Sequence, residues 1–375
     1  MHLICSLQEL ASQPRITSNL AAFLLAFALC AIFITLIRRY APAWGLVDKP
    51  GVRKIHERVM PKGGGIAIVL SLFLAYGLSW YGLGLLTNWL SLPGPFSKET
   101  LAVLGGGLVI ATLGLVDDWC NLKPWTKLTV ESLVAFVLIH FDLRITLFVP
   151  SDWFSFFVTW GWIVLITNSF NLLDNMDGLS AGVAWISAAI FFAAAIQTGQ
   201  WHVTFLLAGL LGSLLGFLAY NFPPASIFMG DCGSLFIGYF MAVLTIYATF
   251  YEPTASIFPV VLPLLAMAVP LFDTGTVAWL RWRQRRPIFQ GDKQHFSHRL
   301  VELGLTRRQA VLTIYLVTFA TGLSTMLLYQ VTLWGAVIIL VQIISLLAII
   351  HILQQTAAQK QHDREQHEPQ SPAKQ

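Results

Sequence analysis

Charged residues are scarce in this sequence. Only 11% of its 375 residues are Asp, Glu, Lys or Arg, whereas 56% are hydrophobic. A soluble domain of ordinary composition carries about 25% charged residues. The deficit extends over most of the chain, which excludes a soluble protein with a single anchor and indicates a polytopic membrane protein. No nucleic-acid partner is expected.

Cysteine is also rare. The four cysteines, Cys5, Cys30, Cys120 and Cys232, show no metal-type spacing. Two of them fall on the cytoplasmic side of the topology derived below, where thiols stay reduced, so no disulfide framework is expected. The first 18 residues lack the basic region of a signal peptide, so we expect the first apolar run to be an ordinary span.

Long apolar runs dominate the rest of the chain. A membrane-spanning helix needs about 20 apolar residues, which predicts an all-α bundle of about eleven spans, or ten if the break at Gln330 is not real. The expected spans are 19–38, 64–86, 100–116, 128–141, 154–170, 179–196, 202–219, 233–250, 256–280, 309–329 and 331–353. We expect one transmembrane domain over 1–353 and a polar, disordered tail over 354–375.

The positive charges set the orientation of these spans. If the N-terminus lies outside and the chain alternates sides, all but three of the 23 Lys and Arg residues lie in inward connections. The exceptions are Arg15, Lys98 and Arg144. Because cytoplasmic loops are enriched in Lys and Arg, we expect the N-terminus outside and the C-terminus inside.

The aspartates of the connections gather on the same predicted side. The outer connections hold only isolated acids, such as Glu99 and Glu252. The cytoplasmic connections hold Asp117, Asp118, Asp174, Asp177, Asp231 and Asp292. Since the topology was fixed from Lys and Arg alone, the sequence independently predicts that several acidic loops converge on one face.

Asp117 and Asp118 are adjacent at the end of one predicted span, in LVDDW. Two like charges this close raise the pKa of one carboxyl unless a cation joins them. A solvated helix end explains an isolated Asp pair equally well. In a helix the two side chains point about 100° apart, so one can hold a metal while the other acts as a base or orients its neighbour.

A spacing of three recurs in NSFNLLDNMDG, which holds Asn168, Asn171, Asp174 and Asp177. In a helix such residues lie along one side. Their oxygen atoms suit Mg²⁺, which keeps several waters and is shared with substrate phosphates. Capping of the next helix is the alternative for Asp177, but it leaves the other three unexplained. We therefore predict a magnesium site here, with Mn²⁺ as the alternative ion.

Two further loops on this face carry residue types that bind ligands. In IFMGDCGS, two glycines flank Asp231 and allow a tight turn near a ligand. Phe228 before them suits either stacking on a base or anchoring the loop in the interface. In DKQHFSHRL, His295 shares a helical face with His298 or Arg299 and offers donors to a pyrophosphate. The arginines that precede this motif follow the ordinary positive-inside bias.

Three features have more than one interpretation. Lys127 begins a span one turn before Glu131 and either neutralises it or points at an anion beside the Asp pair. The basic, glycine-containing loop 47–68 either clamps an anionic substrate or is an ordinary basic loop. Asp273 lies near the cytoplasmic end of a span, where an acid is more often functional or paired than idle. Together, these groups suit chemistry on a phosphate ester with a lipid reactant.

The motifs also match those of one enzyme family. Six of them occur in the family's order between positions 47 and 300: VDKPGVRKIHERVMPKGGGIAI, LVDDW, LKPWTKL, NSFNLLDNMDGLSAG, IFMGDCGSLFIG and DKQHFSHRL. By these motifs the chain resembles the polyprenyl-phosphate N-acetylhexosamine-1-phosphate transferases of glycosyltransferase family 4. Such enzymes require Mg²⁺ and move a sugar-1-phosphate from a UDP-sugar to a polyprenyl phosphate, releasing UMP. The resemblance implies a Mg-dependent phosphoglycosyl transferase acting on UDP-HexNAc and undecaprenyl phosphate. It also implies a location in the inner (plasma) membrane.

The resemblance also implies roles for the motif residues. Asn171 and Asp231 match the pair that contacts the metal. Asp117 resembles the residue that activates or positions the lipid phosphate, with Asp118 supporting it, and Lys127 matches the lysine beside the transferred phosphate. The remaining matches bind substrate and comprise Asp174, Asp177 and Phe228 for the nucleotide and His295, His298 and Arg299 for the sugar phosphate. Direct attack and a covalent aspartyl intermediate both fit these roles.

One position departs from the family's pattern. The usual H-x-H-H reads His295-Phe296-Ser297-His298 here, so Ser297 replaces one histidine. A triple histidine followed by Phe-Glu is typical of the branch that uses UDP-muramoyl-pentapeptide. The departure therefore favours the branch that uses UDP-N-acetylglucosamine or a related UDP-HexNAc and starts O-antigen, teichoic acid or similar surface glycans.

Other functions compete with this interpretation. Within the family, the alternative is a phospho-MurNAc-pentapeptide transferase of peptidoglycan synthesis. From another class, the alternative is a secondary transporter, but transporters place ionisable residues near the bilayer midplane and within repeats, whereas these acids cluster at helix ends. A scaffold without catalysis would leave the acids unexplained. Dimers are common among such membrane enzymes, so a homodimer stays open.

Overall fold

The computed structural model describes residues 14–48, 59–86, 97–248, 257–285 and 295–367. Helices dominate these residues, as the apolar runs predict. The first half comprises α2 (Pro14–Tyr40), β1 (Val47–Asp48), β2 (Met60–Pro61), α3 (Gly64–Leu86), α4 (Lys98–Cys120), α5 (Pro124–His140) and α6 (Asp152–Leu173). The second half comprises α7 (Leu179–Gln197), α8 (Trp201–Asn221), α9 (Asp231–Tyr247), η1 (Phe258–Val261), α10 (Leu262–Ala266), α11 (Ala268–Arg283), α12 (Phe296–Glu302), α13 (Arg307–Thr325), η2 (Met326–Tyr329) and α14 (Leu333–His367).

The lengths and apolar composition of these helices make the chain a multi-pass membrane protein. Within the described residues, seven helices are long and apolar enough to cross a membrane, and one bent pair would make eight. Each of the eleven predicted spans corresponds to a described helix or helix pair, but α3 and α9 count only as shorter apolar helices, and α5 has 17 residues. The all-α membrane fold is confirmed, whereas the number eleven stays a prediction.

The bent pair is η1–α10 with α11, which meet at 61°. Proline explains the break, because Pro270 has no N–H to donate to the carbonyl of Ala266 one turn earlier. Met267 between them leaves the helical conformation, with φ −104° and ψ 22°. The predicted span 256–280 is therefore broken rather than continuous.

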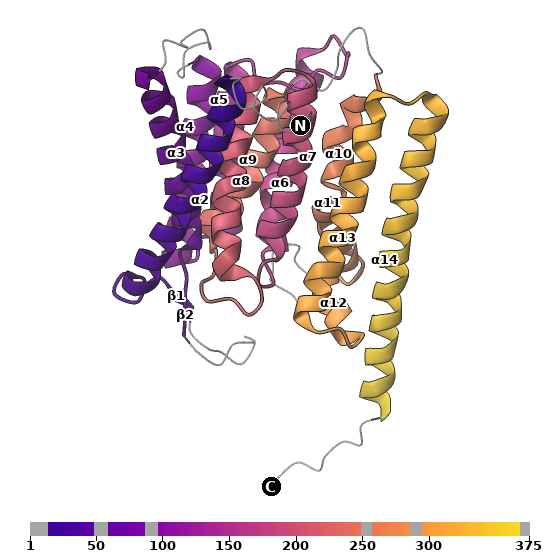
Figure 1. The fold of residues 1–375 in the computed structure, drawn as a ribbon. Helices are drawn as coiled ribbons and strands as arrows, with labels where there is room; N and C mark the ends of the chain where they lie inside the picture. Colours follow the sequence, from indigo (N-terminus) through magenta and orange to yellow (C-terminus); the bar gives the residue numbers. More distant parts are fainter. Residues whose placement is uncertain (1–13, 49–58, 87–96, 249–256, 286–294, 368–375) are drawn as a thin grey trace, which may run out of the picture.

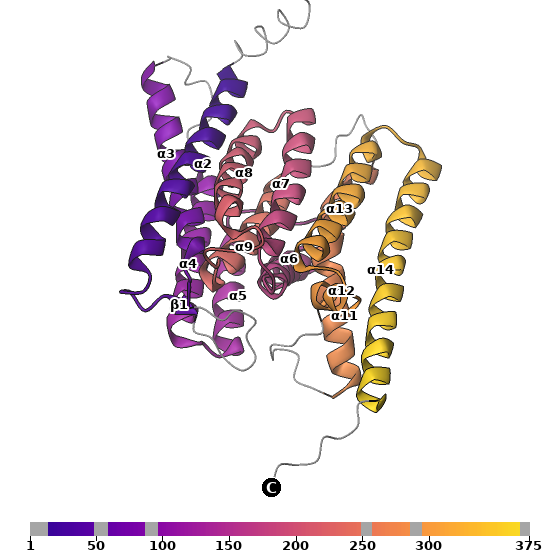
Figure 2. The same cartoon turned by 60° about the horizontal axis from the view of Figure 1, so that its bottom comes forward.

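Helix α9 forms the centre of the bundle. Every residue from 232 to 245 is buried, and α9 packs against α4 and α6. Figures 1 and 2 show α7, α8 and α9 between a side formed by α2 and α3 and a side formed by α11 to α14. Close packing relies on glycine where α8 meets α2, since a Cβ on Gly212 would lie 2.1 Å from the carbonyl oxygen of Phe23.

A short backbone network closes one end of the bundle. β1 and β2 pair antiparallel, with Val47 opposite Pro61. Pro61 also accepts a hydrogen bond from the N–H of Phe228 at 2.9 Å, and the N–H of Gly64 donates to the carbonyl of Phe228 at 2.9 Å. Figure 1 places β1, β2 and α12 at this same end. The predicted convergence of loops is therefore seen.

Helix α14 differs from the predicted end of the last span. It runs for 35 residues to His367, and Figure 1 shows it extending past the other helices at the end that carries β1 and β2. The helix therefore continues beyond the predicted end of the last span at 353, in a stretch where Gln, Ala, Lys, Arg and Glu are good helix formers. Disorder of the tail stays a prediction. Residues 368–375 lie outside the described residues.

Candidate active site

Asp117 is buried at the end of α4 and is held by the start of α5. Its Oδ1 accepts the N–H of Leu122 at 2.6 Å, and its Oδ2 lies 2.8 Å from Nζ of Lys127. Asn121 adopts the left-handed conformation after α4, with φ 48°, and so turns the chain back toward Asp117. Lys127 is therefore paired with Asp117, and its contact with a substrate anion beside the Asp pair stays a prediction. The carboxylate of Glu131 accepts from Asn168 at 2.5 Å.

Asp118 points to a different partner, the first turn of α9. Its carboxylate accepts the backbone N–H of Asp231 at 2.8 Å and that of Cys232 at 3.1 Å. A carboxylate at a helix N-terminus satisfies exposed N–H donors and complements the helix dipole. The close approach of the Asp118 carboxylate to α9 requires glycine at position 230, since a Cβ on Gly230 would lie 2.5 Å from Oδ2 of Asp118. Asp118 thus positions α9.

Lys62 is a site residue that the predicted roles did not include. Its Nζ lies 2.6 Å from Oδ1 of Asp118, whose side chain is fully buried. Burial opposes its charge, but the Asp118 carboxylate, with help from Asp231, raises the pKa of Lys62 above its ordinary value. The position of Lys62 directly before three glycines could have indicated its role. These glycines let α3 approach α9 closely, since a Cβ on Gly65 would lie 2.1 Å from the backbone nitrogen of Gly233.

Asp231 and Asn171, the two residues predicted to contact the metal, lie next to each other. The Oδ1 of Asp231 accepts from Nδ2 of Asn171 at 3.0 Å, and the Oδ2 of Asp231 lies 3.7 Å from Nζ of Lys127. The same amide of Asn171 donates to Oγ of Ser234 at 2.8 Å. The ammonium of Lys127 thus lies between the carboxyl groups of Asp117 and Asp231. We call Asp117, Asp118, Asn171, Asp231, Lys62 and Lys127 the Asp231 cluster.

The spacing of three in NSFNLLDNMDG does not continue along one helix face. Helix α6 ends at Leu173, and Asp174 and Asp177 lie in the turn that follows. Asp177 accepts from the N–H of Ala225 at 3.0 Å, while Gly178 is the N-cap of α7, so the capping alternative is wrong. Burial, together with the charge of Asp231, raises the pKa of Asp174 to about 8.

The histidine motif is fixed by polar contacts of its own. Nδ1 of His295 lies 2.8 Å from Oδ2 of Asp273, and the N–H of Phe296 donates to the other oxygen of Asp273 at 2.9 Å. Ser297, the departure from the family pattern, donates to Oδ1 of Asn175 at 2.5 Å. Asp273 is therefore paired, and α12 is joined to the turn after α6.

The structure also describes three further residues that were predicted to bind substrate. His298 and Arg299 follow on α12 and are half-buried. Phe228 is half-buried and joins β2 through its backbone, as an isolated bridge with Lys62. Contact of these residues with a nucleotide or sugar phosphate stays a prediction. Asp292 lies outside the described residues, as do positions 49–58 of the basic loop.

The donor atoms of the Asp231 cluster fit Mg²⁺. Within the part of the chain that the structure describes, no group of three or more His, Cys, Asp or Glu residues has the geometry of a metal site. Mg²⁺ needs no such cage, because it binds through one or two carboxylates, water and substrate phosphates. The carboxyls of Asp117 and Asp231, both next to the ammonium of Lys127, supply such oxygens, and a shared cation would offset their repulsion. Asn171 turns its amide nitrogen toward Asp231, so its oxygen would have to turn toward the ion to join this set.

Comparison with known proteins defines the family. The family model described as glycosyl transferase family 4 matches residues 100–249. A Bacillus subtilis (strain 168) protein named "Probable undecaprenyl-phosphate N-acetylglucosaminyl 1-phosphate transferase" is 33% identical over 344 residues, which are 90% of this chain and 92% of that protein. The chain belongs to glycosyl transferase family 4.

Two further relatives support membership of glycosyl transferase family 4. The decaprenyl-phosphate N-acetylglucosaminephosphotransferase of Mycobacterium leprae (strain TN) is 32% identical over 72% of this chain and 73% of its own length. The undecaprenyl-phosphate alpha-N-acetylglucosaminyl 1-phosphate transferase of Escherichia coli (strain K12) is 27% identical over 77% of this chain and 78% of its own. These names favour neither the muramoyl-pentapeptide branch nor a transporter.

Proposed function

We propose that this protein transfers GlcNAc-1-phosphate from UDP-GlcNAc to undecaprenyl or another polyprenyl phosphate. The products would be polyprenyl-pyrophosphoryl-GlcNAc and UMP. The observation that carries the proposal is the convergence of three aspartates and two lysines of the Asp231 cluster at one end of an apolar bundle. The relatives' names give the sugar and the lipid.

The reaction forms a bond between an oxygen of the lipid phosphate and the β-phosphorus of the donor. The bond from that phosphorus to the bridging oxygen breaks, and UMP leaves with this oxygen. Asn171 and Asp231 would hold Mg²⁺, which neutralises charge on the pyrophosphate when bound. Lys127 lies between Asp117 and Asp231, so its ammonium can follow the charge of the transferred phosphoryl group.

The two adjacent aspartates take different parts in this proposal. Asp117 shares Lys127 with Asp231 and positions or activates the lipid phosphate. Asp118 already accepts from two N–H groups and Lys62, so it acts by holding α9 in place. We place the site at the cytoplasmic face of the inner membrane, because the loops at this end carry most of the Lys and Arg residues.

Release of UMP by the purified protein tests the proposal. The assay supplies undecaprenyl phosphate and Mg²⁺, and compares UDP-GlcNAc, UDP-GalNAc and UDP-muramoyl-pentapeptide, with EDTA as the metal control. We expect lipid-dependent, EDTA-sensitive UMP from UDP-GlcNAc, and loss of most turnover in Asp117→Asn and in Asp231→Asn. Absence of UMP with every donor, in folded protein, would contradict the proposed reaction.

A further inference from the structure

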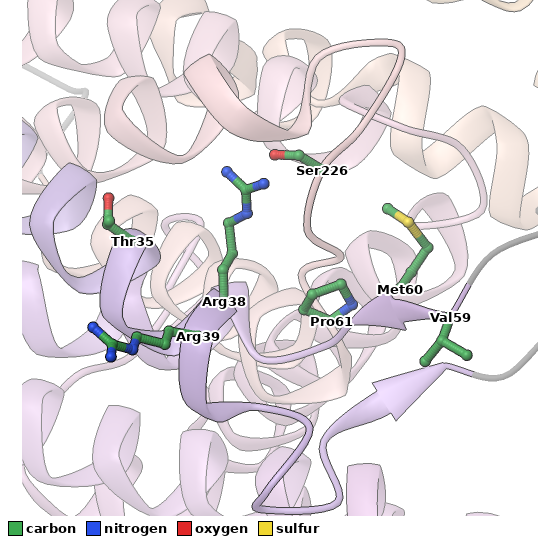
Figure 3. Close-up of a pocket in the computed structure, with 7 residues that line it drawn as sticks. All are labelled: Thr35, Arg38, Arg39, Val59, Met60, Pro61 and Ser226. Carbon is green, nitrogen blue, oxygen red and sulfur yellow. The ribbon is translucent and has the colours of Figure 1, made fainter.

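A separate cavity lies where α2 ends. Its volume is about 530 Å³, which is within the usual range for small-ligand sites. None of its described lining residues belongs to the Asp231 cluster. The residues that matter are Thr35, Arg38 and Arg39 from α2, Met60 and Pro61 from β2, and Ser226 from the loop before α9 (Figure 3).

The charge of this cavity is positive. Figure 3 shows the guanidinium group of Arg38 pointing into it on the side of Ser226, and Arg39 turning the other way from the helix end. Each arginine lies over a ring, Arg38 at 5.9 Å from the centroid of Tyr220 and Arg39 at 5.8 Å from that of Tyr40. Within the described ranges, no carboxylate forms an ion pair with either arginine, unlike Lys62 and Lys127 of the Asp231 cluster.

Two hydroxyl groups in the cavity wall indicate which groups a bound anion would carry beside its charge. The hydroxyl of Thr35 donates to the carbonyl of Ala31 at 2.9 Å, and that of Ser226 donates to the carbonyl of Tyr220 at 2.8 Å. Both hydroxyls have thereby used their protons, and their oxygens remain as acceptors. The cavity thus offers guanidinium groups to a phosphate and oxygen acceptors to hydroxyl groups.

The surface of α2 beyond the cavity suits an acyl chain. Large apolar side chains lie exposed along one stripe of the helix, at Leu24, Ile32 and Leu36. Their spacing in multiples of four keeps them on one side of the helix, and the stripe ends at the two arginines. An apolar stripe that ends in paired cations at a helix terminus has the form expected of a site for an anionic lipid.

We propose that this cavity binds an anionic phospholipid with a hydroxylated headgroup, of the phosphatidylglycerol type. Its phosphodiester lies against Arg38, because one guanidinium group donates two parallel N–H bonds to phosphate oxygens, and Arg39 adds positive charge at the rim of the cavity. The headgroup hydroxyls donate to Thr35 and Ser226, and the acyl chain follows the apolar stripe. This lipid is a ligand distinct from both substrates of the proposed reaction.

Bound lipid would stabilise the end of the bundle that carries the Asp231 cluster. Pro61 in the cavity wall accepts from the N–H of Phe228, and Ser226 lies two residues before Phe228. The residue after Pro61 is Lys62, which holds Asp118. The lipid therefore contacts the two segments that position the first turn of α9, namely β2 and the loop before α9.

Native mass spectrometry of the purified full-length protein tests lipid retention without relying on turnover. Phosphatidylglycerol, phosphatidic acid and phosphatidylcholine are compared, with glycerol 3-phosphate as the soluble competitor. The variant is Arg38→Gln/Arg39→Gln. Its matched control is Arg307→Gln/Arg308→Gln, an adjacent pair of exposed arginines at the start of α13, of which Arg308 also lies over a ring, at 5.4 Å from the centroid of Phe222.

We expect phosphatidylglycerol retention to fall several-fold in Arg38→Gln/Arg39→Gln and to stay unchanged in the control pair. Thr35→Val/Ser226→Ala should remove the preference for phosphatidylglycerol over phosphatidic acid. Equal losses in both arginine pairs would overturn the site in favour of general surface charge. Complete displacement by glycerol 3-phosphate would overturn the lipid in favour of a soluble anion. If Arg38→Gln/Arg39→Gln does not fold, Arg38→Lys/Arg39→Lys keeps the charge, removes the paired donors and should still weaken retention.

Discussion

Replacing Asp118 by Asn would test how the first turn of α9 is held. The carboxylate is fully buried and accepts from two backbone N–H groups and from Lys62. Asn replaces one of the two acceptor oxygens by an NH₂ group that only donates, so at least one partner, such as the N–H of Cys232 at 3.1 Å, loses its acceptor. The ion pair with Lys62 also loses its negative partner.

The size of the effect follows from these lost contacts. A hydrogen bond to a charged group contributes about 1.5–3 kcal/mol, and breaking a buried pair on one side costs about 3–5 kcal/mol. Because the amide keeps one acceptor, we expect a net cost of about 2–4 kcal/mol, smaller than full loss of the pair. If this cost appears as displacement of Asp231, turnover falls by about 30-fold to 1,000-fold, at about 1.4 kcal/mol per factor of ten.

Two measurements separate this positioning role from loss of the whole fold. UMP release gives the turnover, and maleimide labelling of Cys232 reports the first turn of α9, where the thiol is 3% exposed. The labelling uses a Cys5→Ser/Cys120→Ser background, in which buried Cys30 is the internal control. We expect Asp118→Asn to expose Cys232 and not Cys30. Turnover within about twofold of the parent, with Cys232 still protected, would refute the reasoning.

Three further predictions concern neighbouring contacts. Gly114→Ala should reduce UMP release at least about tenfold, because the added Cβ would lie 2.3 Å from the carbonyl oxygen of Asp231. Gly105→Ala is the control and should leave UMP release unchanged, because nothing lies within 4 Å of its added Cβ. Equal activities of the two variants would contradict this prediction. The pKa of Asp174 is about 8, so this carboxyl is neutral below that pH and repels the anionic donor above it. Calorimetric UDP-GlcNAc affinity should therefore fall as pH rises through 8, by up to about tenfold per unit, and a profile unchanged in Asp174→Asn would exclude this carboxyl. Asp273→Asn should raise the KM for the donor more than it lowers kcat, since it loosens α12; a pure kcat loss would argue against this.

The local features of the site could be predicted from the sequence. Adjacent aspartates on a helix must point in different directions, and Asp117 and Asp118 do contact different helices, α5 through Lys127 and α9 through the N–H of Asp231. Apolar runs and Lys and Arg placement predicted that acidic loops share one end of the bundle, which the structure confirms. These inferences depend only on helix geometry and on the cost of charge in a bilayer.

The pairing of charges could not be predicted in the same way. Asp118 meets the N–H of Asp231 across 113 residues of sequence, and such contacts depend on how helices pack. The spacing of Lys127 suggested either neutralisation of Glu131 or contact with an anion beside the Asp pair. Its ion pair with Asp117 depends on the left-handed turn at Asn121, which the spacing did not indicate. The spacing of three failed after Leu173 for a related reason, because Asp, Asn and Gly favour turns over helix.

The backbone network between β2 and the loop before α9 has a consequence for motion. The amides of Gly63, Gly64 and Gly65 all donate to carbonyls of Phe228 and Met229. Breaking one of these bonds strains its neighbours, so the two segments should open as a single cooperative unit. Hydrogen exchange at these three amides would then occur at one common rate. That rate would report how often β2 separates from the loop before α9, which disrupts the Asp231 cluster.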